Sequence, residues 1–537
     1  MNTKWWQKAV IYQIYPRSYL DSTGTGVGDL QGIIRKLDYI KALGVDAVWL
    51  SPVFKSPQDD NGYDISDYQD IDPLFGNLED MMVLLKEANA RGIRILLDMV
   101  LNHTSDEHPW FIESKSSRNN PKHDWYVWRD GEPGTPPNEM GSVFGGSAWE
   151  YVPERGQYYL HQYSVKQPDL NWENPDVRKA LYDMMNWWAD NGAGGFRLDV
   201  IDSIAKDPDA MICAEGPGLH DYIKEMSATV LKGRDLLTVG EAWSATPETA
   251  KLWSNPDGSE LSMVFQFENM VIDQEPGKEK WDPIPLSLPK LKKAIAKWQT
   301  ELHGKGWNSL FWENHDLPRI VSRWGDDGKY REASAKMLAT VLFGLEGTPY
   351  IYQGQELGMT NTRYALEEYR DIEIRNMAKA RLEAGYTEQS ILESIYAKGR
   401  DNARTPMQWN DGPNAGFTTG EPWIKVNPNY TEINVEAQEK DPNSILNYYR
   451  HLTGLRKREQ VILDGVYEEI LAEREDLLAY ARDNGESRLT VAANFTGETI
   501  PFPTEIFADA GKYEIGNYAD APSGGVLRPF EAVMYLK

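Results

Sequence analysis

The stretch Gly195-Phe196-Arg197-Leu198-Asp199-Val200-Ile201-Asp202 has the alternation of a short buried strand. Its apolar residues alternate with Arg197 and Asp199, so the two charged side chains share one face and the apolar ones pack behind them. Taken alone, this pattern is as typical of a buried structural ion pair as of a strand that delivers a carboxylate to a functional site. The surrounding sequence decides between the two interpretations.

Seven more strand patterns occur in the first 360 residues, and amphipathic helical stretches separate most of them. In the stretch 176–191, for example, apolar residues recur at helical spacing until Gly192. Eight strands that alternate with helices predict a parallel (β/α)8 TIM barrel of the α/β class. The predicted strands are 10–15, 47–50, 93–100, 195–200, 236–241, 263–267, 309–312 and 349–352.

Two segments interrupt this alternation. Residues 104–168 are rich in Trp, Tyr, Gly and Pro and predict a loop-rich subdomain inserted after the third strand, and charged helical sequence fills 361–403. Later, the runs 477–481 and 489–493 predict a hairpin within an antiparallel β-domain. We therefore expect a catalytic barrel over 1–103 and 169–459, the inserted subdomain over 104–168, and a C-terminal β-domain over 460–537.

The composition is that of a globular protein with a strong acidic excess. The 537 residues are 41% hydrophobic and 26% charged, and the formal net charge is −26. This charge argues against nucleic acid or an anionic membrane as a partner. The 19 Trp and 28 Tyr suit stacking on sugar faces, although a large core also uses aromatic residues.

Features that would direct the chain to a membrane or to secretion are missing from the sequence. It contains no apolar run of about 18 residues, and residues 1–6 do not resemble a signal-peptide leader. Cys213 is the single cysteine, so no internal disulfide can form, and this usage suits a reducing compartment. We expect a cytoplasmic monomer that has neither a membrane nor a nucleic acid as partner.

Carboxylates stand at the ends of several predicted strands, where a barrel places its functional groups. Asp98 ends the third strand, Asp199 the fourth and Glu241 the fifth, and Asp316 follows the seventh. Any one of them fits a structural role. Four in register are hard to explain by stability, because clustered buried carboxylates repel one another and lose hydration.

These segments resemble the four signature regions of the α-amylase family of glycoside hydrolases, family 13. The matching segments are Asp98-Met99-Val100-Leu101-Asn102-His103, 195–199, Glu241 and His315-Asp316. Further motifs resemble its oligo-1,6-glucosidase and dextran glucosidase (glucan 1,6-α-glucosidase) branch. They are Asp60-Asn61-Gly62-Tyr63-Asp64, Gln167-Pro168-Asp169-Leu170-Asn171, 399–409 and Pro428-Asn429-Tyr430. The resemblance extends from Trp5 to at least residue 458.

The resemblance implies a retaining glycosidase with Asp199 as nucleophile, Glu241 as acid/base and Asp316 as transition-state stabiliser. Such an enzyme needs an ionised nucleophile and a carboxylic acid about 5 Å apart. Arg197 favours the ionised form of Asp199, and the two neighbouring negative charges favour a proton on Glu241.

The resemblance also implies a pocket for one terminal glucose. Tyr63 is expected to stack on the sugar, His103 and His315 to contact its hydroxyls, and Phe144 and Gln167 to line the same pocket, although loop packing explains the last two almost as well. Asp60 and Arg400 are expected to close the pocket, with Arg404 as an alternative to Arg400. A closed pocket implies that single residues are removed from the non-reducing end.

Linkage preference depends on two residues. Val200 follows the nucleophile, and in this branch a valine there accompanies α-1,6 specificity, although valine also simply suits a strand. Trp243 lies two residues after Glu241 and could either support the departing chain or pack in the core. The segment after Glu241 resembles dextran glucosidases, which accept long substrates.

One departure concerns the family's calcium loop, which corresponds to residues 21–29. Thr23 and Thr25 stand where the family usually carries Asn or Asp, so only Asp21 and Asp29 supply carboxylates, with the carbonyl of Val27 as a further donor. Calcium prefers several oxygen ligands, including charged ones. We expect no cofactor in catalysis and leave a weakened structural Ca²⁺ site open.

The sequence thus predicts an exo-acting glucan 1,6-α-glucosidase that releases glucose from isomalto-oligosaccharides and dextran. The alternatives are an oligo-1,6-glucosidase restricted to short substrates, or an α-1,4-glucosidase, trehalose-6-phosphate hydrolase or sucrose isomerase on the same scaffold. A catalytically inactive relative would have lost the carboxylates, whereas all three are present here.

Overall fold

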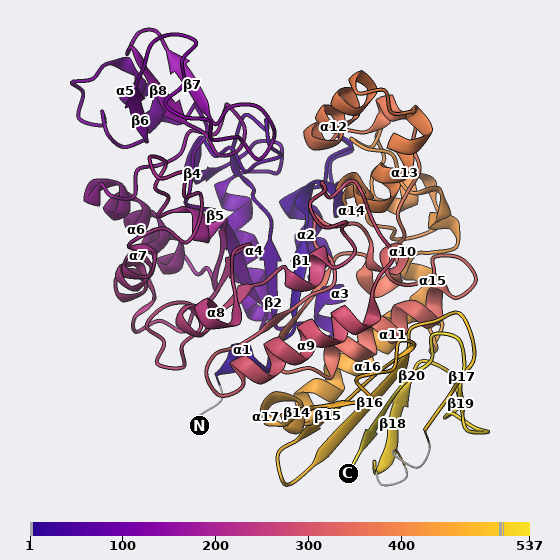
Figure 1. The fold of residues 1–537 in the computed structure, drawn as a ribbon. Coiled ribbons are helices and arrows are strands. Elements are labelled where there is room, and N and C mark those ends of the chain that lie inside the picture. The colour runs from indigo at the N-terminus through magenta and orange to yellow at the C-terminus, as the bar shows by residue number, and fades with distance from the viewer. Residues whose placement is uncertain (1–3, 504–506, 508–509) are drawn as a thin grey trace. The chain divides into compact units, whose positions relative to one another are not determined.

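The computed structural model describes residues 4–503, 507 and 510–537. The chain forms two compact units, and Figure 1 traces its path from one terminus to the other. The first unit comprises Met1–Gly28, Arg35–Val48 and Phe267–Lys537, and the second comprises Asp29–Ile34 and Trp49–Gln266. The three domains expected from the sequence stay a prediction, because the two units do not follow those boundaries.

An eight-stranded sheet forms the core of the fold, with the strand order β11-β10-β9-β5-β2-β1-β13-β12. The pairings β5–β9, β9–β10, β10–β11, β1–β13 and β12–β13 are parallel. This arrangement is the predicted TIM barrel. Its strands are β1 (Ile11–Ile14), β2 (Ala47–Leu50), β5 (Arg94–Val100), β9 (Gly195–Asp199), β10 (Leu237–Glu241), β11 (Met263–Phe265), β12 (Ser309–Leu310) and β13 (Thr348–Tyr352).

All eight predicted strands are confirmed, with differences of one or two residues at their ends. The seventh is shorter than expected, because Phe311 and Trp312 are buried but lie outside the strand ladder. Helix α6 (Pro175–Asp190) matches the predicted stretch 176–191. Asn174 caps it by accepting a hydrogen bond from the backbone N–H of Asp176, and its apolar stripe is buried.

The second unit carries helices around its part of the sheet and a smaller sheet of its own. Its helices include α4 (Leu78–Ala90), α5 (Pro109–Ser116), α6, α7 (Leu219–Met226) and α8 (Pro247–Trp253). The antiparallel sheet β6-β8-β7 comprises Trp128–Asp130, Gln157–Leu160 and Trp149–Val152, in the loop-rich segment after β5. Also in the second unit, a two-stranded antiparallel sheet pairs β3 (Phe54–Lys55) with β4 (Asp67–Ile71).

Helix α5 was not expected, because the sequence 104–168 has little helical period. The helix begins with Pro109 at its first position, and the His108 side chain accepts a hydrogen bond from the backbone N–H of Trp110. A proline and a cap at the first turn define a helix start without any apolar periodicity. Capping therefore identifies this helix where hydrophobic pattern does not.

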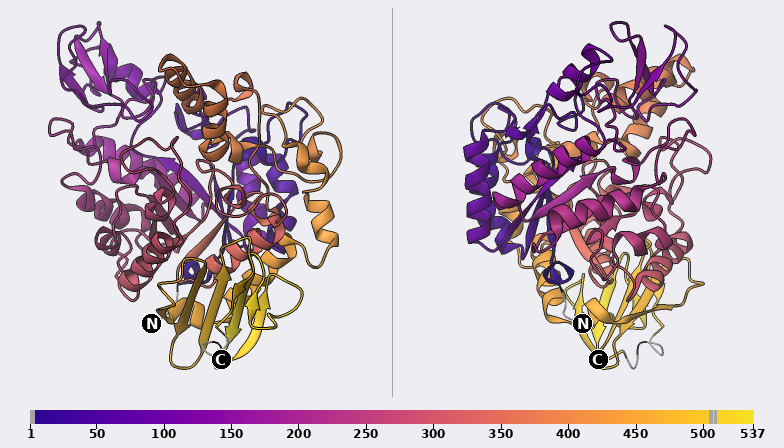
Figure 2. Two further views of the ribbon diagram at one scale, coloured as in Figure 1. Left: turned by 45° about the vertical axis from the view of Figure 1, so that its right-hand side comes forward. Right: turned by 90° about the vertical axis from the view of Figure 1, so that its left-hand side faces the viewer.

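The first unit ends in the predicted antiparallel β-domain. Its sheet has the order β14-β15-β16-β20-β18, and β15 and β16 form the expected hairpin. Helices α9 and α11 lie against this sheet (Figures 1 and 2). The elements are α9 (Leu288–Leu302), α11 (Arg331–Phe343), α16 (Ile445–Arg458), β14 (Val466–Ile470), β15 (Leu477–Asp483), β16 (Arg488–Asn494), β18 (Lys512–Gly516) and β20 (Ala532–Leu536).

Helical sequence after β13 is also confirmed in the first unit. The predicted charged helical segment 361–403 contains α12 (Ile372–Glu383) and α13 (Glu388–Lys398), and α14 (Asp401–Arg404) lies at its end. The remaining helices are short, and β17 (Ile500–Pro501) pairs with β19 (Val526–Leu527). The short helices are α1 (Trp5–Lys8), α2 (Leu30–Arg35), α3 (Leu37–Ala42), α10 (Ile320–Arg323), α15 (Val435–Lys440) and α17 (Val461–Asp464).

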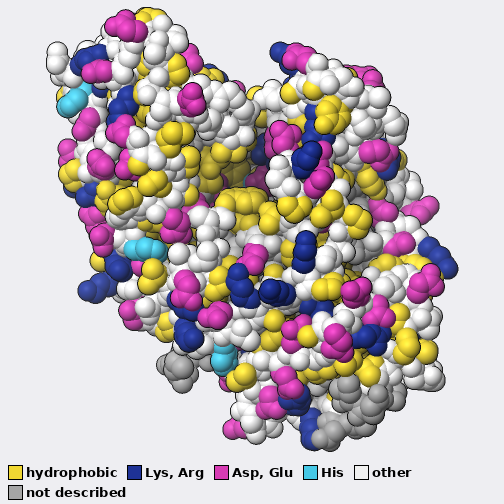
Figure 3. Space-filling view, in the orientation of Figure 1, with side chains coloured by type: hydrophobic (Ala, Val, Ile, Leu, Met, Phe, Trp, Pro, Cys, Tyr) yellow, Lys and Arg dark blue, Asp and Glu magenta, His cyan; other side chains and the backbone are white. Residues whose placement is uncertain are grey.

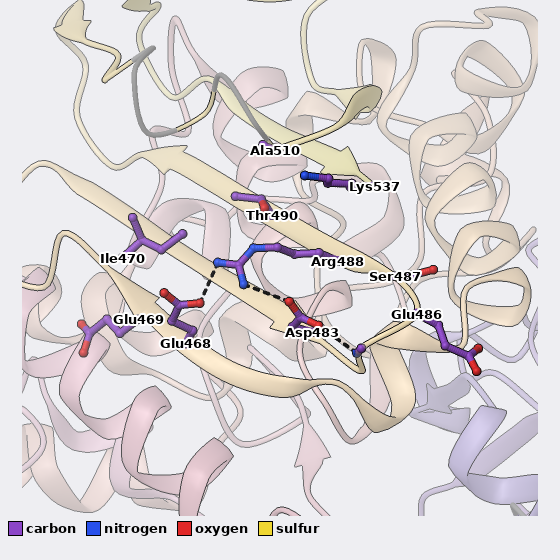
Figure 4. A pocket seen from close by; sticks show the side chains of 11 residues that line it. Glu468, Glu469, Ile470, Asp483, Glu486, Ser487, Arg488, Thr490, Ala510 and Lys537 are labelled. Carbon is purple, nitrogen blue, oxygen red and sulfur yellow. Dashed lines mark hydrogen bonds and ion pairs between the residues drawn. The ribbon is translucent and has the colours of Figure 1, made fainter.

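Acidic and basic side chains are interspersed over the visible face of the molecule (Figure 3). The C-terminal sheet carries a hollow of about 630 Å³ in which Arg488 contacts Glu468 and Asp483 (Figure 4). Within the described residues, every helix is too short or too polar to cross a membrane.

Candidate active site

Three neighbouring strands of the second unit bring three carboxyl groups to one guanidinium. The β5–β9 register places Asp98 opposite Arg197, and Arg197 Nη1 lies 2.7 Å from Asp98 Oδ1 and 2.7 Å from Asp199 Oδ1. Arg197 Nη2 donates to Oε2 of Glu241, at the end of β10. Arg197 is only 2% exposed. The expected pairing of Arg197 with Asp199 is therefore present, and it is part of a larger cluster.

The charges of this cluster do not balance, since three carboxylates would face a single cation. Burial raises the pKa of Asp98, and it raises the pKa of Asp199 well above its usual range. Arg197 opposes this effect, whereas the charge of Glu241 adds to it. The sequence had led us to expect that Arg197 keeps Asp199 ionised, but burial is the larger effect. The cluster therefore retains a proton more readily than isolated carboxyls do.

Glu241 has two further contacts. Its Oε1 accepts a hydrogen bond from Trp243 Nε1 at 2.9 Å, and its Oε2 lies 3.3 Å from the backbone nitrogen of Val200. Trp243 is 49% exposed, which rules out the alternative of a core tryptophan. Its indole therefore offers an aromatic surface directly beside a carboxyl group.

Val200 turns the chain immediately after Asp199. Its φ of 35° and ψ of 44° lie in the left-handed region, which β-branched residues rarely adopt. The turn ends β9 and directs the Val200 N–H toward Glu241. Such strain persists only where the surroundings impose it, and it is typical of functional sites.

The other expected sugar contacts of the second unit form one connected group. Tyr63 donates its hydroxyl to Asp98 Oδ2 at 3.0 Å. Gln167 Nε2 donates to Asp60 Oδ2 at 3.1 Å and lies 3.2 Å from His103 Nε2. Burial lowers the pKa of His103 to about 4, so its ring is neutral at neutral pH.

Phe144 joins this group through an aromatic residue that the sequence did not single out. Its ring lies 5.8 Å from that of Tyr163 in an edge-on arrangement, and the Tyr163 ring lies 5.3 Å from that of His103. The Tyr63 N–H donates to the Asp60 carbonyl oxygen at 3.1 Å. Of the sequence-derived candidates, Asp60, Tyr63, His103, Phe144 and Gln167 therefore form one continuous network.

In the first unit, two arginines and a histidine contact Asp316. Arg404 Nη2 lies 2.7 Å and Arg400 Nη1 3.3 Å from Asp316 Oδ1, and His315 Nε2 lies 3.1 Å from Oδ2. Arg404, the alternative to Arg400, thus makes the shorter contact. Arg400 itself pairs with Asp371, whose Oδ1 is 2.6 Å from Nη2.

Asp60 and Arg400 belong to different units, and their expected closure of the pocket stays a prediction. Sequence reasoning missed Asp371 as the partner of Arg400, and it noted Asp98 as a strand end without assigning it to the site. The β5–β9 pairing supplies the signal for Asp98, because a buried arginine on a neighbouring strand needs more than one acceptor. Asp371 lies 29 residues before Arg400, and no spacing rule connects the two.

Hydrogen bonds satisfy the loop that resembles a calcium site. Asp21 accepts from the backbone N–H groups of Thr23, Gly24 and Gly26 at 2.7–2.9 Å and from Thr418 Oγ1 at 2.5 Å. Burial acts to raise the pKa of Asp21, but these hydrogen bonds outweigh it and lower the pKa.

The remaining oxygens of the loop are engaged in a similar way. Thr23 Oγ1 donates to Asp21, Thr25 Oγ1 lies 3.4 Å from the carbonyl oxygen of Val27, and Asp29 Oδ1 accepts from Gly32 N–H. In the described residues, no group of three or more His, Cys, Asp or Glu side chains is arranged to hold a metal. The structural Ca²⁺ site that the sequence left open stays a prediction.

Comparison with known proteins agrees with this geometry. Residues 13–465 match the family model "Alpha amylase, catalytic domain". The oligo-1,6-glucosidase of Parageobacillus thermoglucosidasius is 53% identical, over 100% of this chain and 99% of that protein. The glucan 1,6-alpha-glucosidase of Streptococcus pneumoniae is also 53% identical, over 93% of this chain and 92% of that protein.

A solved structure is similar along the whole chain. The trehalose-6-phosphate hydrolase of Bacillus licheniformis superposes with a TM-score of 0.94 at 48% identity, over 99% of this chain and 100% of that chain. The family match covers most of the chain, and the signature carboxyls Asp98, Asp199 and Glu241 are clustered around Arg197. The chain belongs to the α-amylase family of glycoside hydrolases.

Proposed function

We propose that this enzyme is a retaining, exo-acting glucan 1,6-α-glucosidase that releases glucose from the non-reducing ends of isomalto-oligosaccharides and dextran. The observation that carries the proposal is the shared guanidinium, because Asp199 and Glu241 contact two nitrogens of Arg197. Retaining glycosidases need two carboxyl groups about 5 Å apart, and a shared guanidinium keeps two carboxyl groups near each other. The similarity to enzymes named for α-1,6 cleavage supports the linkage.

In the proposed mechanism, Asp199 attacks the anomeric carbon while Glu241 gives its proton to the glycosidic oxygen. The bond to the leaving sugar breaks and a glycosyl-Asp199 ester forms. Glu241, now ionised, then removes a proton from water, whose oxygen attacks the same carbon. The ester bond to Asp199 breaks, α-glucose is released and the Asp199 carboxylate is restored. Arg197 supports this cycle, because its charge acts against burial and favours the ionised form of Asp199 that the attack requires.

Asp316 is proposed to bind sugar hydroxyls and stabilise the oxocarbenium-like transition state. Arg400 and Arg404 both contact its Oδ1 and hold the side chain in place, and a carboxylate suits contact with developing positive charge. His103 is neutral and can contact a hydroxyl without adding charge. The Tyr63 ring is proposed to stack on the terminal glucose, and Trp243 on the departing chain.

A substrate panel tests the proposal. Initial rates are measured with isomaltose, isomaltotriose, longer isomalto-oligosaccharides and dextran, and with maltose, sucrose and trehalose 6-phosphate. We expect cleavage of all α-1,6 substrates and little of the others. Loss of activity beyond isomaltotriose would favour the short-substrate oligo-1,6-glucosidase, and faster cleavage of maltose would overturn the linkage.

The substrate panel includes trehalose 6-phosphate because a trehalose-6-phosphate hydrolase of Bacillus subtilis is 48% identical to this chain. Proton NMR of the first product tests retention. α-Glucose is expected at early times, and β-glucose as the first anomer would contradict the proposed role of Asp199.

The proposal extends to cofactors, assembly and location. Catalysis is proposed to need no cofactor, and the loop 21–29 to fold without calcium, as its internal hydrogen bonds suggest. We further propose a cytoplasmic monomer. Cys213 is an exposed free thiol, which suits a reducing compartment. Sedimentation equilibrium of the purified protein tests the monomer, and fractionation of the source cells tests the location.

A further inference from the structure

The proposed mechanism leaves one buried carboxyl beside the acid/base unused. Asp202 lies in the short 3-10 turn Ile201–Ser203 after β9 and is 2% exposed. Its Oδ2 accepts two hydrogen bonds from Ser244, one from the backbone N–H at 3.0 Å and one from Oγ at 2.6 Å. We propose that Asp202 and Ser244 are positioning residues that hold Trp243 against Glu241 and so aim the proton donor.

The segment between Glu241 and Ser244 is short enough for this contact to matter. Glu241 is held at one end by the β10–β11 ladder, in which it is opposite Phe265. Ala242 is buried, and its N–H donates to the Phe265 carbonyl at 3.3 Å. Asp202 holds Ser244 at the other end. Trp243 is therefore held on both sides of its backbone, although half of its side chain is exposed.

A half-exposed tryptophan needs such support if its N–H is to meet a defined oxygen. The indole Nε1 only donates, so its bond to Glu241 Oε1 fixes the rotation of the carboxyl group. A proton donor that is off by a fraction of an ångström loses much of its effect. The Asp202–Ser244 contact thus acts on catalysis through Trp243, without touching the substrate.

The state of Asp202 at neutral pH suits this role. Burial raises its pKa to about 6, while the hydrogen bonds from Ser244 act in the opposite direction. The carboxyl is therefore mostly ionised at neutral pH and accepts both bonds. Glu215 is the other carboxyl near Ser244, with Oε1 3.4 Å from Oγ, and this longer contact does not replace the one to Asp202.

Two substrates with different leaving groups separate a positioning role of Asp202 and Ser244 from a purely structural one. Isomaltose expels a sugar alkoxide and needs protonation, whereas 4-nitrophenyl α-glucoside expels an acidic phenol and hardly does. A loosened proton donor therefore slows isomaltose selectively. A site that is merely distorted or less stable loses both activities together.

The experiment compares Asp202→Asn and Ser244→Ala with the matched control Ser203→Ala. Ser203 adjoins Asp202 but lies 3.5 Å from its other oxygen and has no part in the proposed machinery. We expect kcat/KM for isomaltose to fall about tenfold in the first two variants and the aryl glucoside to change less than about threefold. The control is expected to retain both activities.

The double variant sharpens the result. If the two residues act as one device, Asp202→Asn/Ser244→Ala loses no more than the larger single loss. Equal losses on both substrates, or no loss on either, would overturn the inference. Ser244→Ala keeps the test available if Asp202→Asn does not fold.

The inference rests on the proposed function, and Glu241→Gln separates the two. A much larger loss on isomaltose than on the aryl glucoside in Glu241→Gln supports Glu241 as the acid. If Glu241→Gln shows this selectivity and the positioning variants do not, only the inference fails. If Glu241→Gln shows none, the proposed role of Glu241 fails first.

Discussion

The Arg197 cluster of the second unit and the Asp316 cluster of the first unit use the same residue types in opposite proportions. Around Arg197, three carboxyls share one guanidinium. Around Asp316, two guanidiniums and an imidazole face one carboxylate that is 29% exposed. Excess acid retains a proton and suits proton transfer, whereas excess cation keeps a carboxylate ionised and suits binding.

The largest expected effect tests the acid-rich cluster directly. Asp199→Ala and Glu241→Gln are each expected to lower kcat/KM for isomaltose at least about a hundredfold, because one removes the nucleophile and the other the proton donor. The control is Asp183→Asn, a substitution at an exposed position of α6. Near-native turnover in either variant, with far-UV circular dichroism unchanged, would contradict the assignment.

The next prediction compares the two clusters through their arginines. Arg197→Met leaves three buried carboxyls without their shared cation and is expected to reduce the free energy of unfolding by about 3–5 kcal/mol at neutral pH. Arg404→Met leaves Asp316 with Arg400 and is expected to reduce it by about 1–2 kcal/mol. Urea denaturation measures both.

The pH dependence of the Arg197→Met variant provides a further check. Without the guanidinium, the buried carboxyls have raised pKa values, so the folded state binds more protons than the unfolded state. Its stability must then fall as the pH rises. Equal stability losses in Arg197→Met and Arg404→Met, independent of pH, would remove the distinction between the clusters.

Asp371 offers a test on the cation-rich side. Burial acts to raise its pKa, but Arg400 outweighs burial and lowers the pKa to about 2. Because the folded pKa is lower than the unfolded one, the carboxylate's contribution is present above about pH 4 and is lost as the pH falls toward 2. Asp371→Asn is therefore expected to reduce stability by about 2 kcal/mol at neutral pH and by less in acid.

Urea denaturation from neutral pH down to about pH 3 measures this loss. The control is Asp411→Asn, a substitution at an exposed position. A loss in Asp371→Asn that is as large in acid as at neutral pH would show that Asp371 contributes through packing and not through its charge.

The smallest effect is expected at Asp21, a carboxylate held by N–H and O–H donors and not by a cation. Chelation with EDTA is expected to leave the melting temperature unchanged, whereas Asp21→Ala lowers it by several degrees because buried N–H groups lose their acceptor. A melting temperature that falls with EDTA and recovers with added Ca²⁺ would contradict the hydrogen-bonded account of the loop.

The sequence predicts strand positions and the carboxyl groups at their ends because both follow a short-range rule. The alternation in 195–200 determines which side chains share a face, and the barrel architecture determines which strand ends meet. The prediction of Asp199 beside Arg197 needs only the pleat of one strand.

Other features depend on contacts between distant segments and have no local signal. Asp371 finds Arg400 through the packing of the helices after β13, and Asp202 meets Ser244 across two neighbouring strand ends. The left-handed turn at Val200 contradicts its residue preference, so no propensity predicts it. The pKa of Asp199 is raised by burial, although Arg197 was expected to lower it. A single sequence does not show how completely Arg197 and its neighbours are enclosed.

Arg197 and Asp199 sit two residues apart on one strand, so their separation is a property of the β-backbone and not of any loop. The pair is consequently built into the central eight-stranded sheet, whereas Trp243 and Phe144 lie on connecting segments. Redesign of substrate choice can therefore work on those segments and leave the reactive pair where it is. Changes at Phe144 can alter substrate binding without moving this pair, whereas changes at Trp243 also act on the acid/base Glu241.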